Sequence, residues 1–306
     1  MTSSLFFAQL LNGFQLGLLL FLLSAGLTLV LGIMNFVNLA HGSLYMLGAY
    51  LGAAAYAQWD SFLVAALAAT IGTLVIGLVI ERTVLTRLYQ RNPLYQVLGT
   101  FGLILIANEV VRIVWGPSPM FINVPEALSG TVNLFGLPYP SYRFAIIAVG
   151  LAVGAALYLA IHKTRIGMLI RAGASDAMMV SALGVNIKQV NAIVFGVGAA
   201  LAGIAGLMAA PILSVQPGMG EPILVLTLVV IVTGGVGSIR GAFYGALIVG
   251  IVDTMGRALL PGLMEQLFER SVAQAAGPAL ASMLIYLLMA AVLAIRPQGL
   301  FPVKHG

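Results

Sequence analysis

Long apolar runs separated by short polar loops dominate the chain. The first run extends from Met1 to Trp59 without an Asp, Glu, Lys or Arg residue. A helix needs about 20 apolar residues to cross a bilayer, so each long run predicts a transmembrane helix. The predicted spans are Phe6–Leu31, Ala40–Ala57, Ser61–Ile80, Leu94–Val114, Arg143–Ile161, Val190–Ala210, Pro222–Gly235, Ala242–Leu259 and Ala279–Ile295.

Three of the predicted spans are short. Ala40–Ala57 and Ala242–Leu259 are rich in glycine, and Pro222–Gly235 has the length of a partial or re-entrant helix. Because the loops are brief, the pattern indicates one helical bundle rather than separate domains. We therefore predict an all-α polytopic membrane protein with about 8–10 transmembrane helices, some short or broken, in a single domain over residues 1–306.

The composition agrees with a lipid-facing surface. Hydrophobic residues make up 61% of the chain and charged residues 8%, against about 25% charged residues in a soluble domain. The 36 glycines suit close contacts between membrane helices. There is no cysteine, which excludes disulfides and thiolate chemistry. The first residues lack the basic region of a signal peptide, so the first run is predicted to be a retained span.

Lysine and arginine residues lie in short, separate loops, so the net charge of +5 does not indicate a nucleic-acid-binding face. Such residues accumulate on the cytoplasmic side of membranes. Gly116–Tyr142 contains neither and is predicted to lie outside. The tail with Arg296 and Lys304 is predicted to be cytoplasmic, and nine spans then place the N-terminus outside. The predicted cytoplasmic loops carry Arg82, Arg87, Arg91, Lys163, Arg165, Arg171 and Lys188.

The stretch Leu260–Gly277 interrupts the apolar pattern. Leu263, Met264, Leu267 and Phe268 would share one face of a helix. This periodicity predicts a short helix lying on the outer membrane interface, and a solvated loop is the alternative.

Enzyme signatures are absent from the sequence. The histidines are His41, His162 and His305, so neither an HExxH motif nor a histidine-rich metal site is present. No GxxxxGK[ST] motif occurs, and the glycine-rich Gly234–Gly241 lacks the dinucleotide-binding spacing. We predict no metal, no cofactor and no ATP hydrolysis by this chain. ATP-driven transport would require a partner that supplies the ATPase.

Two opposite-charge pairs lie within predicted spans. Glu109 and Arg112 are three residues apart, and Asp253 and Arg257 are four apart, so each pair can neutralise itself on one helix face. An ion-coupled carrier usually needs an unpaired carboxylate near the bilayer midplane. None is evident, which weakens the ion-coupled hypothesis.

Polar residues also interrupt the uncharged N-terminal run. Asn35, Asn38 and His41 recur every third residue, and Gly42 follows. Non-helical or polar backbone at membrane depth is found where it is buried in protein or lines a wet cavity. The spacing is compatible with a broken helix that lines a substrate pathway, and equally with a polar turn that caps the next helix.

At these residues the sequence resembles a known family, the permeases of branched-chain amino acid ABC importers. The resemblance covers roughly Gln9 to Pro302 and is closest to the subunit with an NFAHG-like N-terminal signature, although Leu39 replaces the more familiar Phe in "NLAHG". The matching segments are Gly26–Tyr50, Arg165–Asn186, Phe195–Pro211 and Val232–Gly250.

The resemblance implies a transport subunit in the bacterial inner membrane. Its partners would be a second related permease, two cytoplasmic ATP-binding subunits and a periplasmic or lipid-anchored substrate-binding protein. Branched-chain amino acids are the implied cargo, and similar permeases carry urea, short amides or other amino acids. A stand-alone channel or ion-coupled carrier is the alternative from another class, and it would transport solute without ATP.

Residues 162–189 then form the expected cytoplasmic coupling loop, in which the core Ala174–Gly184 suits a short helix. Asp176 favours the helix start and Gly184 its end. The apolar side chains between them can dock in a groove of another protein, although the loop could instead rest on its own spans. The coupling residues are predicted to be Arg171, Ala174, Asp176, Met178, Met179, Leu183 and Gly184.

Gly237, Gly241 and Gly245 form two successive GxxxG steps. On a helix they would make a smooth face for tight packing, within this subunit or against a second permease. Arg240 lies between them and is expensive at the bilayer centre, so it marks either a cytoplasmic turn or a polar cavity.

Overall fold

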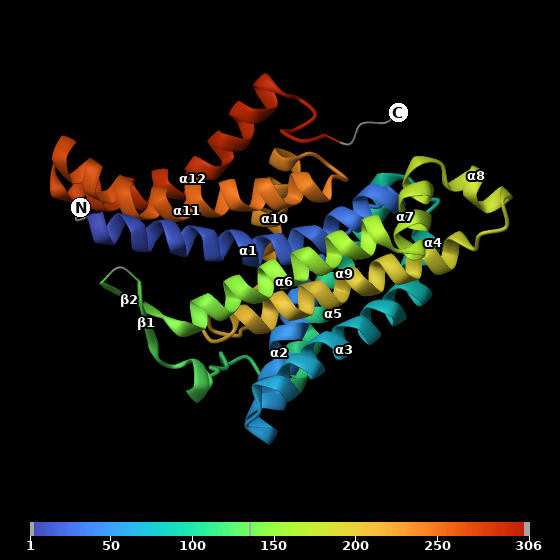
Figure 1. The fold of residues 1–306 in the computed structure, drawn as a ribbon, viewed down its shortest axis with the longest axis horizontal. Helices are drawn as coiled ribbons and strands as arrows, with labels where there is room; N and C mark the ends of the chain where they lie inside the picture. Colours follow the sequence, from blue (N-terminus) through green and yellow to red (C-terminus); the bar gives the residue numbers. More distant parts are fainter. Residues whose placement is uncertain (1–2, 135, 303–306) are drawn as a thin grey trace.

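The computed structural model describes residues 3–134 and 136–302 as a helical bundle (Figure 1). Seven helices of the described part are long and apolar enough to cross a membrane, which confirms an all-α polytopic fold. The main helices are α1 (Ser3–Met34), α2 (His41–Trp59), α3 (Phe62–Ile80), α5 (Pro93–Trp115), α6 (Ser141–Lys163), α9 (Ile187–Ala209), α10 (Gly220–Gly234), α11 (Ile239–Leu267) and α12 (Arg270–Ile295).

Each of the nine predicted spans coincides with one of these helices and extends beyond it by one residue at most. The helices α2 and α10 are not among the seven. Both were predicted as short spans, and α10 (Gly220–Gly234) is a shorter apolar helix. The remaining elements are the π-helix η1 (Glu81–Leu85), α4 (Thr86–Leu88), η2 (Glu126–Leu128), β1 (Thr131–Leu134), β2 (Leu137–Pro140), α7 (Arg165–Ser175) and α8 (Ala177–Ala182).

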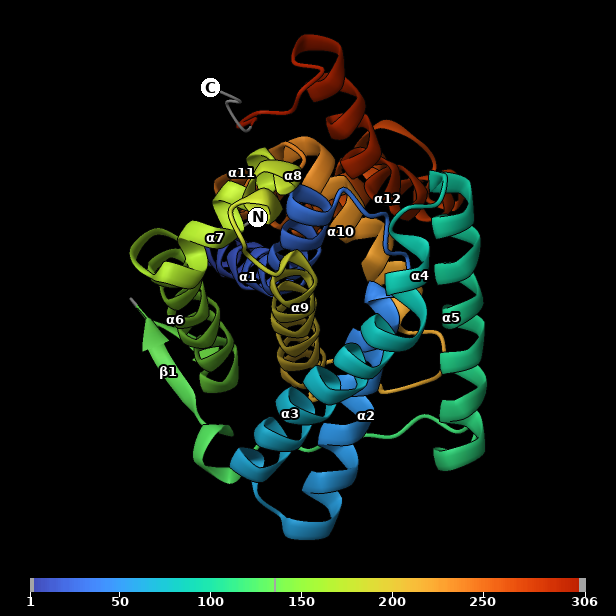
Figure 2. The same ribbon diagram turned by 90° about the vertical axis from the view of Figure 1, so that its right-hand side faces the viewer.

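The centre of the bundle is formed by α1, α2 and α9, which are buried along most of their length. Figure 2 shows α9 nearly end-on between α1 and α3, with α5 standing at one edge. Glycines permit the close packing, because a Cβ on Gly26 of α1 would lie 2.8 Å from the carbonyl oxygen of Gly198 on α9. The outer helices expose apolar side chains such as Leu63, Leu98 and Leu287, as lipid contact requires.

Residues 116–140 connect α5 to α6 at the N-terminal end of the bundle (Figure 1). They contain the antiparallel pair β1 and β2, in which Thr131 pairs with Pro140. Met120 and Val215 exchange backbone hydrogen bonds of 2.8 and 2.9 Å, which tie this segment to the α9–α10 connection. The hairpin was not predicted, since four-residue strands give little periodicity.

The stretch Leu260–Gly277 does not form the predicted short interfacial helix. It forms instead the end of α11 and the beginning of α12, with the break at Phe268 and Glu269. A Cβ on Gly277 would lie 2.8 Å from the Cα atom of Pro261, so the two helix ends pack directly against each other. This pairing between helices leaves no signal in the local periodicity.

The chain after α12 returns to the end of α10. The backbone N–H of Leu300 donates to Thr233 O at 2.9 Å, and that of Phe301 donates to Gly234 O at 2.8 Å. The tail thus satisfies carbonyl groups left free at a helix C-terminus. Lys304 and His305 lie outside the described residues.

Candidate functional site

The six residues 35–40 are not helical and separate α1 from α2. Asn35 begins the break with a φ of 47°, a conformation that asparagine tolerates better than most residues. Side chains of α5 replace the missing helical hydrogen bonds. Gln96 Oε1 accepts from the N–H of Val37 at 3.3 Å, and Thr100 Oγ1 accepts from the N–H of Leu39 at 3.3 Å.

The four residues predicted to line a pathway occupy different surroundings. Asn38 and His41 are buried, whereas Asn35 is exposed. Asn38 Oδ1 accepts from the N–H of Ala40 at 3.0 Å, and His41 Nε2 lies 3.1 Å from Leu23 O. Asn38 Nδ2 and His41 Nδ1 have no hydrogen-bond partner in the described part of the chain.

Gly42, the fourth of these residues, lies at the crossing of α2 and α10. Its backbone contacts that of Gly220 so closely that a Cβ on either glycine would overlap the other. None of the four residues lines either of the two cavities described below. Their place in a substrate pathway remains a prediction.

The predicted coupling loop contains two helices rather than one. Ala174 belongs to the end of α7, and Asp176 separates α7 from α8. Asp176 Oδ1 accepts from the N–H of Met179 at 2.9 Å, so Asp176 is the N-cap of α8. Gly184 follows α8 with a φ of +88°, the left-handed conformation expected after a helix C-terminus.

Apolar side chains project from α8 into the surroundings. Met178, Met179 and Leu183 are 83%, 59% and 77% exposed, while Val180 is buried. Arg171 of α7 is also exposed, but its guanidinium donates to the carbonyl of Ile161 on α6. The structure therefore presents three of the predicted residues as a surface and uses Arg171 to attach α7 to α6.

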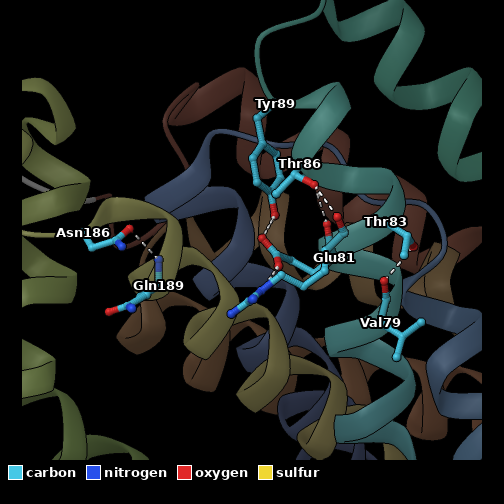
Figure 3. A network of polar contacts seen from close by, with 8 residues as sticks. Val79, Glu81, Thr83, Thr86, Tyr89, Asn186 and Gln189 are labelled. Atoms are coloured by element: carbon cyan, nitrogen blue, oxygen red, sulfur yellow. Dashed lines mark hydrogen bonds and ion pairs between the residues drawn. The ribbon is translucent and has the colours of Figure 1, made fainter.

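A buried carboxylate lies close to this loop (Figure 3). Glu81 is fully buried at the start of η1, and its Oε1 accepts from the hydroxyl of Tyr89 at 2.8 Å. Its Oε2 has no hydrogen-bond partner among the described residues and lies 3.7 Å from Nε of Arg82. Burial, and then the Glu81 carboxylate, raise the pKa of Tyr89 above its usual value, so this hydroxyl stays protonated and donates.

A cavity of about 230 Å³ separates Glu81 from the first turn of α9. Asn186, the N-cap of α9, lines it together with Lys188 and Gln189. Figure 3 shows Asn186 and Gln189 on one side of Glu81. This first turn follows α8 directly in the chain. A displacement of α8 would therefore act on the packing between α9 and η1.

Comparison with known proteins decides the family. Residues 9–293 match the family described as the branched-chain amino acid transport system permease component. The chain belongs to this permease family. It is 30% identical to the high-affinity branched-chain amino acid transport system permease protein LivH of Escherichia coli over 269 residues, which cover 83% of this chain and 87% of that protein.

Two further relatives mark the range of the similarity. The corresponding permease protein BraD of Pseudomonas aeruginosa is 30% identical over 263 residues, or 81% of this permease and 85% of BraD. The ribose import permease protein RbsC of Escherichia coli is 26% identical over 249 residues, or 76% of this permease and 72% of RbsC. No solved structure matches.

The three glycines predicted to share a helix face of the permease do not all lie on a helix. Gly237 precedes α11 and has a φ of 79°, so the predicted continuous glycine face is wrong. Gly241 and Gly245 are on α11 and pack against the backbone of α10, which places their contacts within this subunit. Arg240 is exposed in the first turn of α11, at the helix end rather than at the bilayer centre.

Both predicted ion pairs of the permease form. Arg112 Nη1 lies 2.9 Å from Glu109 Oε1, and both side chains are exposed. Nε of Arg257 donates to both carboxylate oxygens of Asp253 at 3.0 Å. Each acid is therefore neutralised by an arginine on its own helix, as the i,i+3 and i,i+4 spacing indicates.

The sequence analysis did not identify Gln96 and Thr100, whose side chains bind the backbone of residues 35–40, or the buried carboxylate of Glu81. Gln96 and Thr100 are 59 and 61 residues from the backbone groups that they bind, and Glu81 is recognisable only by its burial. The available signal was the presence of polar residues within otherwise apolar spans.

Proposed function

We propose that this permease is one subunit of an ATP-driven importer that moves branched-chain amino acids across the bacterial inner membrane. Curated relatives at 30% identity are named as branched-chain amino acid permeases, which supports the cargo. Urea, short amides and other amino acids are the alternative cargoes. The chain has no P-loop motif, so the ATPase resides in separate subunits.

The observation that carries the coupling role is the surface of α8. It projects Met178, Met179 and Leu183 from the bundle, capped at one end by Asp176 and terminated by Gly184. Methionine side chains adapt well to a groove in another protein. We assign α8 as the element that docks on an ATP-binding subunit, and residues 162–189 as the loop that carries it.

The distribution of charge supports a cytoplasmic position for α8. Basic residues cluster in a few segments of the chain: Arg82, Arg87 and Arg91 lie between α3 and α5, Lys163, Arg165 and Lys188 border α7 and α8, and Arg240 lies in the first turn of α11. In Figure 1 these segments and the C-terminus lie toward one end of the bundle, and the N-terminus and the hairpin toward the other. Lysine and arginine accumulate on the cytoplasmic side, so we place the C-terminus inside and residues 116–140 outside.

The break at 35–40 supplies the proposed point of substrate passage. It contains Asn35 and Asn38, with His41 and Gly42 in the first turn of α2, and α5 holds it through neutral side chains. ATP binding in the partner subunits would move α8 and, through α9, the packing around this break. Alternating access would follow between this chain and a second related permease.

Purification in mild detergent from the native membrane, followed by mass spectrometry, tests the assembly. Recovery of a second permease and two P-loop ATPases is the expected result, and leucine uptake by the reconstituted complex should require ATP and a binding protein. A chain recovered alone, with solute flux in proteoliposomes that is indifferent to ATP, would instead establish a stand-alone channel or ion-coupled carrier.

A further inference from the structure

A second cavity, of about 280 Å³, lies at the bundle end opposite α8. Its polar lining comes from three helices that are far apart in sequence. Gln9, Asn12 and Gln15 recur at three-residue intervals on α1, Arg143 lies in the first turn of α6, and Thr254 belongs to α11. This volume is close to the lower end of the roughly 300–1,000 Å³ range of small-molecule sites.

Arg143 is a cation without a counter-charge in the described part of the chain, where the ion pairs involve Arg82, Arg112 and Arg257. Its guanidinium donates to Oδ1 of Asn12, a neutral amide oxygen. A guanidinium carries five N–H donors, so most of its capacity for an anion is unused. An uncompensated cation in a half-buried position is costly unless an anion approaches it.

Neighbouring groups hold this arrangement in place. The hydroxyl of Tyr139 donates to the same Oδ1 atom of Asn12 at 3.1 Å, and Asn12 Nδ2 donates to Gln9 Oε1 at 3.1 Å. Burial raises the pKa of Tyr139 despite the nearby Arg143, so the hydroxyl remains a donor. Asn12 is therefore fixed by two neighbours and in turn orients the guanidinium of Arg143.

Gln15 gives an independent indication of a ligand. Its side chain lines the cavity and is only 5% exposed, yet it makes no hydrogen bond to a described residue. Buried side-chain amides in proteins normally have a hydrogen-bond partner. The apolar part of the lining includes Leu16, Leu19 and Leu213.

We propose that this cavity binds a small apolar α-amino acid through its carboxylate, with the carboxylate on Arg143 and the side chain against the apolar lining. Arginine and carboxylate groups form paired, charge-assisted hydrogen bonds. The amide oxygens of Gln9 and Gln15 accept from the ammonium group. The choice of an amino acid rests on the proposed function, whereas the preference for a carboxylate rests on the cavity alone. The site lies far from residues 35–40, near the opposite end of α1.

A ligand-observed NMR titration of the purified chain in phosphatidylcholine nanodiscs tests the site. L-Leucine should bind weakly but saturably, and L-leucinamide, which lacks the carboxylate, should bind about tenfold or more weakly. R143Q should lose leucine binding to the same extent. R112Q is the matched control, because Arg112 is an exposed arginine at the same end of the bundle, and it should bind leucine like the unmodified chain.

R143K keeps the positive charge and is the second variant, which tests the site even if R143Q does not fold. It should weaken leucine binding several-fold, because an ammonium lacks the paired donor geometry of a guanidinium. Equal binding of leucine and leucinamide, or unchanged binding by R143Q and R143K, would overturn the proposal.

An anionic lipid headgroup shares the chemistry of a carboxylate, so the titration is repeated in nanodiscs that contain phosphatidylglycerol. Leucine binding should persist. Its loss, together with lower retention of phosphatidylglycerol by purified R143Q, would assign the cavity to a lipid phosphate and overturn the amino acid.

Leucine uptake by the reconstituted importer distinguishes a failure of this proposal from a failure of the proposed function. In the reconstituted importer R143Q should lower leucine uptake, while R112Q should not. If the unmodified complex carried no amino acid, the proposed function would fail, and the leucine titration would still decide whether the cavity binds a carboxylate.

Discussion

Replacing Asp176, the N-cap of α8, tests the coupling surface most directly. Asp176 Oδ1 accepts from the N–H of Met179 at 2.9 Å, and α8 is only six residues long. Helices of this length are not stable by themselves, so the cap contributes much of what keeps α8 formed. Replacement of a capping Asp by Ala typically costs about 1 kcal/mol. That cost lowers the ratio of formed to unformed α8 about fivefold, since every 1.4 kcal/mol is about tenfold.

Two measurements follow the consequence of Asp176→Ala. Hydrogen exchange of the purified chain should show amides of residues 179–182 exchanging up to about fivefold faster. In proteoliposomes that contain the partner subunits and a loaded binding protein, ATP hydrolysis and leucine uptake should fall by a similar factor. Asp176→Asn is the matched control, because Asn caps as well as Asp while the charge is removed, and it should leave both measurements unchanged.

Each combination of results points to a different error. Unchanged exchange in Asp176→Ala would refute the argument that the cap stabilises α8. Faster exchange with normal hydrolysis and uptake would show that α8 is not the coupling element. If Asp176→Asn lost activity while its exchange stayed normal, the carboxylate itself would contact the partner, and the capping argument would not explain coupling.

Three further substitutions, two of them with a control variant, test the packing and the buried polar groups by thermal unfolding. Gly48→Ala should destabilise the bundle by about 1–3 kcal/mol, because its Cβ would overlap the backbone of α9, whereas Gly102→Ala, with open space around it, should be neutral or stabilising by about 0.5–1 kcal/mol. Tyr89→Phe should cost about 1.5–3 kcal/mol through the lost bond to the buried carboxylate; Tyr95→Phe, at an exposed site, should cost nothing measurable. Thr100→Val should cost about 1 kcal/mol and reduce uptake, because the break after α1 loses an acceptor.

The helices were largely predictable from the sequence, and the reason is the solvent. Lipid offers no hydrogen-bond partners, so a long apolar run must satisfy its own backbone as a helix. The failures lie where a neighbour overrides the local pattern. The stretch Leu260–Gly277 interrupts the apolar pattern, yet it belongs to the long helices α11 and α12, which pack against each other at Gly277. The prediction that Gly237 shares a helix face with Gly241 and Gly245 failed for a different reason, since spacing alone does not distinguish a turn from a helix.

The candidate site was predictable only where its chemistry is local. The cap by Asp176 and the helix end at Gly184 depend on residues within a few positions of each other, so the sequence contained the whole signal. The buried carboxylate of Glu81 and the support by Gln96 depend on contacts between helices. Burial and partner identity follow from tertiary packing, for which a single sequence has no comparable periodic signal.

The polar residues in the uncharged N-terminal run can now be explained by the needs of the backbone. A break in a buried helix leaves peptide groups without partners, and each such group is costly. Neutral side chains satisfy them at less cost than charged ones: Gln96 and Thr100 accept from two N–H groups, Asn38 accepts from a third, and His41 Nε2 bonds to a carbonyl. Asn38 Nδ2 and His41 Nδ1 have no partner among the described residues. The hypothesis that the break contacts a solute therefore depends, for its buried residues, on these two nitrogen atoms.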